Sequence, residues 1–233
     1  IFGSTYSIIM NFFNQNEIEY KLIIKYVVGL FIMNIGIAFS IKSNLGSTPV
    51  VSVPYAISLI TGIDIGICNT LFQCFLVLIE FMLLRSAFHP KHFLQVFVGI
   101  LFGAFTSISM IILSIIPQAS VLWVQILFLI LGILFLAFGL FLYVPTNVVP
   151  VAVDGLTQAV SITTNQSFTK IKVIMDISWI VLSWILSFVF LGHFDGSAGI
   201  RTIIAAMSIG TTVKLMNMIY ARFSGQEADL KKM

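Results

Sequence analysis

Long runs of apolar residues divide the chain into candidate membrane-spanning helices. A helix needs about 20 consecutive apolar residues to cross the hydrocarbon core of a bilayer. Six runs meet that length, and they cover residues 21–41, 66–84, 92–116, 121–144, 168–191 and 197–219. The pattern therefore predicts an all-α polytopic membrane protein with six transmembrane helices.

Two further apolar stretches, residues 49–60 and 150–162, are too short to cross a bilayer. As helices they would reach only about 18–20 Å at the usual rise per residue. Each begins with a proline near its first turn, where the missing N–H is tolerated, and each follows a polar interruption (residues 42–48 and 145–147). We interpret both stretches as half-helices or re-entrant segments.

The composition supports a membrane protein and excludes several other classes. Hydrophobic residues make up 59% of the 233 residues and charged residues only 9%, whereas a soluble domain carries about a quarter charged residues. A soluble enzyme, a disordered chain and a nucleic-acid-binding protein are therefore excluded. Motifs for nucleotide binding, hydrolysis or metal binding are absent from the sequence. We therefore expect no enzymatic activity, no cofactor and no metal.

The distribution of basic residues predicts the orientation in the membrane, because loops on the cytoplasmic side are enriched in Lys and Arg. With six crossings, only Lys42 and Arg201 fall on one side of the membrane. The other side receives ten basic residues: Lys21, Lys25, Arg85, Lys91, Lys170, Lys172, Lys214, Arg222, Lys231 and Lys232. Both termini are therefore expected in the cytoplasm.

The two halves of the chain resemble each other. A shift of 103 positions without a gap aligns Gly29 with Gly132, Gly36 with Gly139, Asn44 with Asn147, Ala56 with Ala159, Ser58 with Ser161 and Thr61 with Thr164. Each half contains a span, a polar interruption, a half-helix and two more spans. Because three crossings invert the second half, the pattern indicates two inverted-topology repeats, an architecture of many secondary transporters.

The repeat divides the chain into four parts. Residues 1–20 are expected to be a cytoplasmic leader, interfacial or loosely ordered, and residues 221–233 a cytoplasmic tail. Residues 21–118 form the first predicted membrane repeat, and residues 119–220 form the second, inverted repeat.

Polar residues at the two interruptions predict a cavity. Irregular backbone at membrane depth requires protein or water to satisfy its polar groups. The free N–H groups at a helix N-terminus also favour an anionic or carbonyl oxygen. The first interruption supplies Lys42, Asn44, Ser47 and Thr48, and the second interruption with its half-helix supplies Thr146, Asn147, Asp154, Thr157 and Gln158.

Polar stripes on two spans provide further candidates. Asn69 and Gln73 lie one helical turn apart in the span 66–84, and the 103-residue shift maps them to Lys172 and Asp176. A charged side chain inside a membrane is expensive and is a candidate functional group. Asp176 either binds solute or a coupling cation, or only pairs with Lys172 for packing. Glu80 is interpreted as structural or as reaching the cytoplasmic interface.

Four short motifs resemble those of a bacterial membrane protein family of the YczE/YyaS/YitT type. They are Leu45-Gly46-Ser47-Thr48-Pro49, Gly62-Ile63-Asp64-Ile65-Gly66, Val153-Asp154-Gly155-Leu156 and Gly199-Ile200-Arg201-Thr202. The chain differs from the family at Val50, where tryptophan is usual, and at Arg201, where glycine is usual. The resemblance implies a multi-pass protein of the bacterial inner membrane with this architecture.

We expect a secondary transporter or facilitator that moves a small polar solute by alternating access, with Asp176 or Asp154 carrying a coupling proton or sodium ion. The alternative is an accessory membrane protein, either the substrate-binding subunit of an importer or the helper of a biosynthetic enzyme. The expected partners are the lipid bilayer and the solute, together with a second copy of the chain or another subunit. No nucleic-acid partner is expected.

Overall fold

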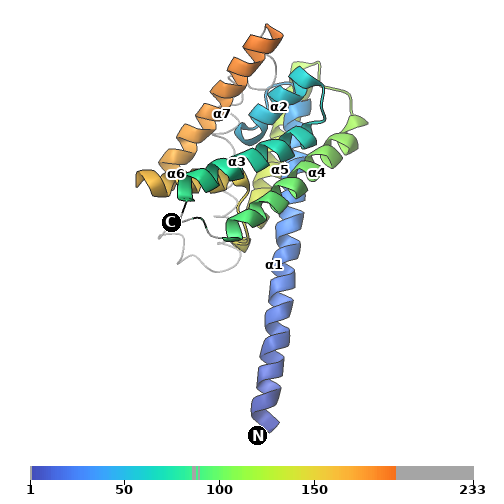
Figure 1. Cartoon of the computed structure of the whole chain (residues 1–233). Helices are drawn as coiled ribbons and strands as arrows, with labels where there is room; N and C mark the ends of the chain where they lie inside the picture. The colour runs from blue at the N-terminus through green and yellow to red at the C-terminus, as the bar shows by residue number, and fades with distance from the viewer. Residues whose placement is uncertain (1, 86–87, 89, 193–233) are drawn as a thin grey trace.

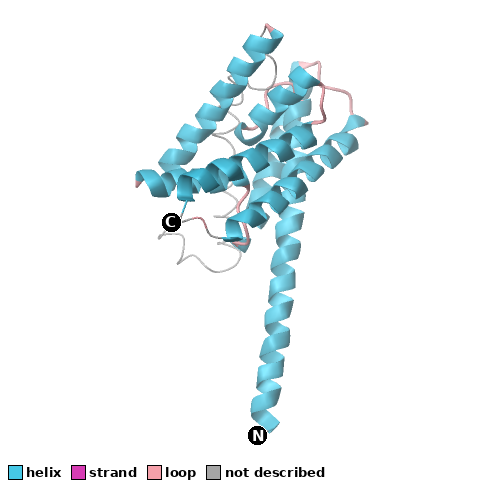
Figure 2. Ribbon diagram, viewed as in Figure 1, coloured by secondary structure: helices cyan, strands magenta, loops and turns pink. Residues whose placement is uncertain are grey.

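The computed structural model describes residues 2–85, 88 and 90–192, and this part of the chain is helical and contains no strand (Figure 2). The α-helices are α1 (Phe2–Lys42), α2 (Pro49–Thr61), α3 (Ile65–Leu84), α4 (Leu94–Ser114), α5 (Leu122–Tyr143), α6 (Ala152–Thr164) and α7 (Phe168–Leu191). Two short 3₁₀ helices, η2 (Pro90–Phe93) and η3 (Val144–Thr146), precede α4 and follow α5.

Five described helices are long and apolar enough to cross a membrane: Tyr20–Lys42 within α1, α3, α4, α5 continued by η3, and α7. Large apolar side chains on these helices are exposed, as expected for contact with lipid tails. The chain is therefore embedded in a membrane. The predicted span 197–219 lies outside the described residues, as does the predicted tail.

Helix α1 is longer than the predicted span, because it begins at Phe2 and continues to Lys42 without a break. Figure 1 shows its N-terminal part extending as one rod away from the other helices. No proline or glycine lies between Gly3 and Gly29 to stop the helix. The structure therefore shows no boundary near residue 20, where we expected the leader to end.

Helices α2 and α6 are the two predicted half-helices, and the chain folds back before each of them. Asn44 and Asn147 adopt left-handed φ angles of 55° and 53° at these turns, which asparagine tolerates better than most residues. After the first turn, the hydroxyl of Ser40 in α1 donates a hydrogen bond of 3.0 Å to the carbonyl of Gly46. Each short helix therefore begins inside the bundle, beside the long helix that precedes it.

The ends of the two short helices are built in the same way. The Ser58 hydroxyl donates to the Ile63 carbonyl at 2.6 Å after α2, and the Ser161 hydroxyl donates to the Gln166 carbonyl at 2.6 Å after α6. These four positions are related by the 103-residue shift, as are the bounds of the two helices. The matching sequences therefore fold into matching local structures.

Helices α1 and α5 approach each other closely at glycines. An added Cβ on Gly36 would lie 2.5 Å from the backbone nitrogen of Leu136, and one on Gly139 would lie 2.5 Å from that of Met33. Only glycine permits such a close backbone approach. Because higher residue numbers on α1 meet lower numbers on α5, the two helices run antiparallel.

The two short helices each pack on a long helix. Helix α2 packs on α7, and helix α3 packs on α6 as well as on α4 (Figure 1). The Ser183 hydroxyl of α7 donates a 3.1 Å hydrogen bond to the Ser52 carbonyl of α2, and Gly155 of α6 lies against the side chain of Gln95 at the start of α4. Each short helix is thus held by a long helix of the other half.

Candidate functional site

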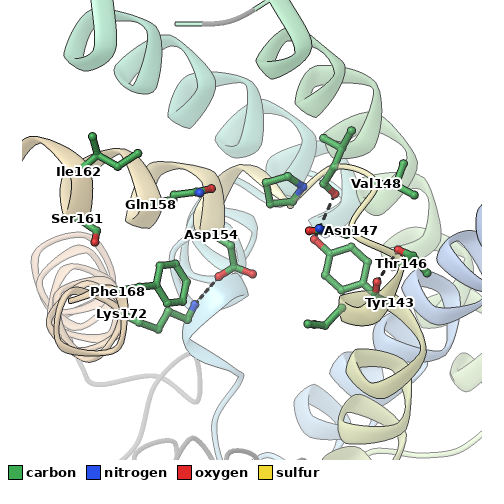
Figure 3. Close-up of a pocket in the computed structure, with 13 residues that line it drawn as sticks. Tyr143, Thr146, Asn147, Val148, Asp154, Gln158, Ser161, Ile162, Phe168 and Lys172 are labelled. Atoms are coloured by element: carbon green, nitrogen blue, oxygen red, sulfur yellow. Dashed lines mark hydrogen bonds and ion pairs between the residues drawn. The ribbon is translucent and has the colours of Figure 1, made fainter. Parts of the chain in front are cut away.

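Two adjoining cavities lie where the interruptions meet the helices of the second half. The larger cavity has a volume of about 580 Å³ and lies beside the turn between α5 and α6, as Figure 3 shows. The smaller cavity, of about 130 Å³, lies deeper and is lined from α1, α2, α5, α6 and α7. Tyr143, Asp154 and Lys172 line both cavities, and the two spaces therefore meet at these side chains.

Three charged side chains form the centre of the site, and we call Asp154, Lys172 and Asp176 the charged triad. The Lys172 Nζ atom lies 2.8 Å from Asp154 Oδ1 and 3.0 Å from Asp176 Oδ1. Each side chain is about a quarter exposed, at 26%, 25% and 24%. With two carboxylates and one ammonium group, the triad has a formal charge of −1 when all three are ionised.

The first turn of α6 positions Asp154, so its carboxylate lies at the helix end where the peptide dipoles favour negative charge. The Tyr143 hydroxyl accepts a 2.8 Å hydrogen bond from the Val151 N–H, and it lies 3.4 Å from the Val149 carbonyl. The Tyr26 hydroxyl donates to the same carbonyl at 2.8 Å. Two tyrosines therefore fix the turn that carries Asp154 into the cavity.

The first interruption reaches the same place from the other half. Thr48, Pro49 and Val50, at the start of α2, line the smaller cavity together with Asp154 and Asp176. The Thr48 Oγ1 atom is buried and has no hydrogen-bond partner within the described structure. Both short helices thus bring their N-terminal ends to one small space, which contains the charged triad.

The structure gathers six of the ten predicted site residues at these cavities: Thr48, Asn147, Asp154, Gln158, Lys172 and Asp176. Thr146, also predicted near the second interruption, lines the larger cavity. Asn44, Ser47, Asn69 and Gln73 do not line either cavity. Asn44 is exposed at its turn and Ser47 is buried. The predicted residues of the second half therefore lie together at the cavities, whereas of those in the first half only Thr48 does.

Asn69 and Gln73 instead belong to a buried group of neutral side chains that we call the amide cluster, with Asn34 and Thr106. The Asn69 Nδ2 atom donates to Thr106 Oγ1 at 3.1 Å, and Thr106 donates to Asn34 Oδ1 at 2.7 Å. All four residues have 0% exposure. Helix α4 covers this face of α3 because Gly99 allows it to pack directly on Gln73.

Two other predictions also need correction. Lys42 lines neither of the two cavities, and its Nζ atom donates to the Ile116 carbonyl at 2.9 Å just after α4. Thr157 is buried and donates to the Val153 carbonyl within its own helix. Of the two roles left open for Glu80, the structure agrees with the structural one, because this residue has 0% exposure and contacts His92.

Sequence reasoning missed Tyr143 and Phe168, which both line the larger cavity. An aromatic residue near the end of an apolar span is usually a membrane-interface or packing residue, so neither was selected. The 103-residue shift offered one signal for Tyr143, because it aligns this residue with the polar residue Ser40. Sequence reasoning also missed Asn34 and Thr106, because they are isolated polar residues within apolar runs.

The predicted pairing of Asp176 with Lys172 one turn away is present, but Lys172 also contacts Asp154 on another helix. Lys172 therefore lines the cavity, although the charge count assigned it to the cytoplasmic side. Without Lys172 the count is nine basic residues against two. The same asymmetry therefore still predicts that both termini are cytoplasmic.

The spans, the interrupted helices and the charged cavity define the class: a helical, multi-pass membrane protein with a polar site inside its bundle. The chain belongs to a family of unknown function, DUF6198, whose profile matches residues 20–218. An uncharacterized protein of Haemophilus influenzae is 28% identical over 204 residues, which cover 88% of this chain and 87% of that protein. No solved structure matches the chain. The narrower resemblance to the YczE/YyaS/YitT type stays a prediction.

Proposed function

We propose that this chain is a secondary transporter or facilitator that moves a small polar solute across a bacterial inner membrane. The observation that carries the proposal is the charged triad in a cavity where two short helices begin. Lys172 and Asp176 lie about 6 and 12 Å along the membrane-spanning helix α7, at the usual rise per residue. Charged groups at this depth are characteristic of solute and ion pathways.

We further propose that the two halves, residues 21–118 and 119–220, are inverted repeats. The short helices have bounds that differ by 103 residues, Pro49–Thr61 and Ala152–Thr164. Gly29 lies against Gly139, and Gly36 lies against Gly132. Since the shift relates Gly29 to Gly132 and Gly36 to Gly139, these contacts are reciprocal, as they are across a two-fold axis.

Inverted repeats suggest how access to the site alternates. The larger cavity opens beside the second interruption, on the side predicted to be cytoplasmic. If the halves exchange conformations, this cavity closes and an equivalent one opens beside the first interruption. Subtracting 103 from the residues of the present cavity gives the expected lining of the other one, which includes Val51, Tyr55, Ser58 and Asn69.

The triad also indicates how a polar solute binds. Lys172 is held between two carboxylates, and all three side chains are partly exposed to the cavities. A solute with its own charged or hydrogen-bonding groups replaces some of these contacts without leaving a charge unpaired. A proton or a sodium ion on Asp154 or Asp176 compensates the second carboxylate and is the coupling species that we propose.

Cysteine accessibility tests alternating access without knowledge of the solute. Cys68 and Cys74 are first replaced by alanine, and single cysteines are then introduced as Gln158→Cys and Tyr55→Cys, which are equivalent positions in the two halves. A membrane-impermeant maleimide is added to vesicles of either orientation. We expect Gln158→Cys to react from the cytoplasmic side and Tyr55→Cys from the opposite side. Reaction of both cysteines from one side contradicts alternating access.

Flux measurements then separate the transporter from the accessory protein. The purified chain is reconstituted in liposomes and tested with a panel of labelled amino acids, organic acids and small amines. We expect flux of at least one class, and its loss in Lys172→Gln. Lys170→Gln is the matched control, because Lys170 lies on the same helix and its Nζ atom donates to the exposed Gln166. Absence of flux together with a stably co-purified protein favours the accessory role.

A further inference from the structure

A second ionisable group is buried in the first half, away from the charged triad. Glu80 near the end of α3 has 0% exposure, although it carries a carboxyl group. Its Oε1 atom contacts His92 Nδ1 and lies 3.4 Å from Gln95 Nε2. We call Glu80, His92 and Gln95 the Glu80 cluster. None of the three lines the two cavities described above.

Two oxygen atoms in the Glu80 cluster have no partner within the described structure. They are Glu80 Oε2 and Gln95 Oε1, and both are buried. An ionised carboxylate with an unpaired buried oxygen is strongly unfavourable. A proton on Glu80 Oε2 removes the charge and creates a donor, and the unpaired Gln95 Oε1 atom is its proposed acceptor once the amide turns, because Nε2 now faces Glu80. A single proton therefore relieves both deficiencies.

We propose that the Glu80 cluster is a proton-binding site that is linked to the position of helix α6. Protonation forms an O–H bond at Glu80 Oε2, with the proton supplied by water on the side predicted to be cytoplasmic, and it converts the carboxylate to a neutral acid. Loss of the proton reverses the step. His92 gives the cluster its exposed side, because its side chain is 27% exposed while that of Glu80 is 1% exposed.

Few other ionisable side chains near Glu80 could bind the proton in place of its carboxyl group. Helix α4 carries no ionisable side chain, α2 carries only Tyr55, and α6 carries only Asp154, which pairs with Lys172. Besides His92, η2 carries Lys91, and Arg85 directly follows α3. Within the described structure, His92 is the ionisable side chain that contacts the Glu80 carboxyl group.

The link to transport comes from Gly155, the residue after Asp154 on α6. An added Cβ on Gly155 would lie 2.5 Å from Gln95 Nε2 and 2.7 Å from Gln95 Oε1. The amide that faces Glu80 therefore also rests on the backbone of the helix that carries Asp154. Turning this amide to meet a protonated Glu80 changes the surface on which α6 packs. This link rests on the proposed function, whereas proton binding by Glu80 does not.

Infrared difference spectroscopy tests proton binding on the purified full-length chain. Spectra are recorded between acidic and alkaline pH, and the C=O band of a protonated carboxylic acid is followed. We expect a band that is lost at alkaline pH and is absent in Glu80→Gln. The control variants Asp154→Asn and Asp176→Asn remove the carboxylates of the charged triad and should retain the Glu80 band. A band that persists in Glu80→Gln overturns the proposal.

Two further measurements address the case in which Glu80→Gln does not fold and the case in which the site binds sodium instead of a proton. If Glu80→Gln does not fold, Glu80→Asp should shift the band without abolishing it, and an unshifted band overturns the proposal. Sodium chloride is also compared with choline chloride at constant pH. We expect no difference, and a band that sodium removes would identify a sodium site instead of a proton site.

The link to α6 is tested with the Gln158→Cys variant. We expect its maleimide labelling rate to change over the pH range in which the Glu80 band titrates, and this pH dependence to disappear when Glu80→Gln is added. A titrating band with labelling that is independent of pH overturns the link and leaves the proton site. This outcome is distinct from failure of the proposed function. If alternating access is wrong, Tyr55→Cys does not react from the side opposite to Gln158→Cys.

Discussion

The charged triad and the amide cluster share two equivalent positions in the two halves but differ in chemistry and surroundings. The 103-residue shift relates Asn69 to Lys172 and Gln73 to Asp176. Asn69 and Gln73 are neutral and have 0% exposure, whereas Lys172 and Asp176 are charged and about a quarter exposed. The two halves thus combine similar helices with different side chains.

Under the proposed function, this difference assigns the solute-binding chemistry to the second half. Neutral amides are tolerated in a dry helix contact, while a lysine and two carboxylates need one another and a hydrated space. The charged position lies beside the cavities, and the neutral position is closed by α4. Similar folding of two halves therefore does not make them equal in function, and substitutions at equivalent positions should separate the two properties.

The largest effect is expected at Lys172, because its removal leaves Asp154 and Asp176 without their common cation. Breaking a buried ion pair by removing one partner costs about 3–5 kcal/mol, and partial exposure places Lys172→Gln near the lower end. We expect loss of transport and a lower free energy of unfolding in detergent. The Lys170→Gln control should change stability by less than about 0.5 kcal/mol.

A double substitution sharpens this test by placing the neutral residues of the first half at the two equivalent positions of α7. Lys172→Asn with Asp176→Gln gives α7 the side chains of Asn69 and Gln73. We expect it to recover part of the stability lost in Lys172→Gln, because one carboxylate is removed together with the lysine, but not to recover transport. Transport by the double variant would show that the charges do not handle the solute.

A second prediction concerns the contact of α1 with α5, where the two halves should behave alike. An added Cβ on Gly36 or Gly139 lies 2.5 Å from backbone nitrogen, which neither helix can avoid without moving. We therefore expect Gly36→Ala and Gly139→Ala each to lower the free energy of unfolding by about 2 kcal/mol. Gly132→Ala, with 3.0 Å as its nearest contact, should cost less.

Thermal unfolding of the purified variants in one detergent measures these effects. Similar losses for Gly36→Ala and Gly139→Ala, set against the unequal effects expected at Asn69 and Lys172, would support a symmetric scaffold with an asymmetric site. A large loss at only one of the two glycines would argue that the halves are not related by a two-fold axis.

The helices were largely predictable because their signals are local. The short helix predicted over residues 49–60 is observed as Pro49–Thr61, and the one predicted over 150–162 as Ala152–Thr164. Prolines and polar interruptions mark these starts in the sequence itself. The continuation of α1 to Phe2 was not predicted, because polarity indicated a change of environment near residue 20 but nothing there stops a helix.

Residues at the cavities could be selected by their charge or by their place at a polar interruption, as Thr48, Asn147 and Gln158 were. Asp154, Lys172 and Asp176 are expensive inside a membrane and were selected for that reason. Asn69 and Gln73 were selected by the same spacing but lie in a closed contact, because helical periodicity identifies a face and not the helix that covers it. The partners of Glu80 were not predicted, because His92 and Gln95 follow a turn and no pattern within one helix connects them to Glu80.

The smallest expected effect has the opposite sign and lies in the amide cluster. Both polar atoms of the Gln73 side chain are buried without a hydrogen-bond partner within the described structure, so Gln73→Leu removes an unfavourable burial. We expect a gain of about 1 kcal/mol in the free energy of unfolding. Asn69→Leu should instead lose about 1 kcal/mol, because Asn69 is bonded to Thr106. If Gln73 faces a hydrated cavity in the other conformation, the stabilised Gln73→Leu variant should also slow labelling of Tyr55→Cys. Stabilisation without this slowing would show that Gln73 lines no cavity in either conformation.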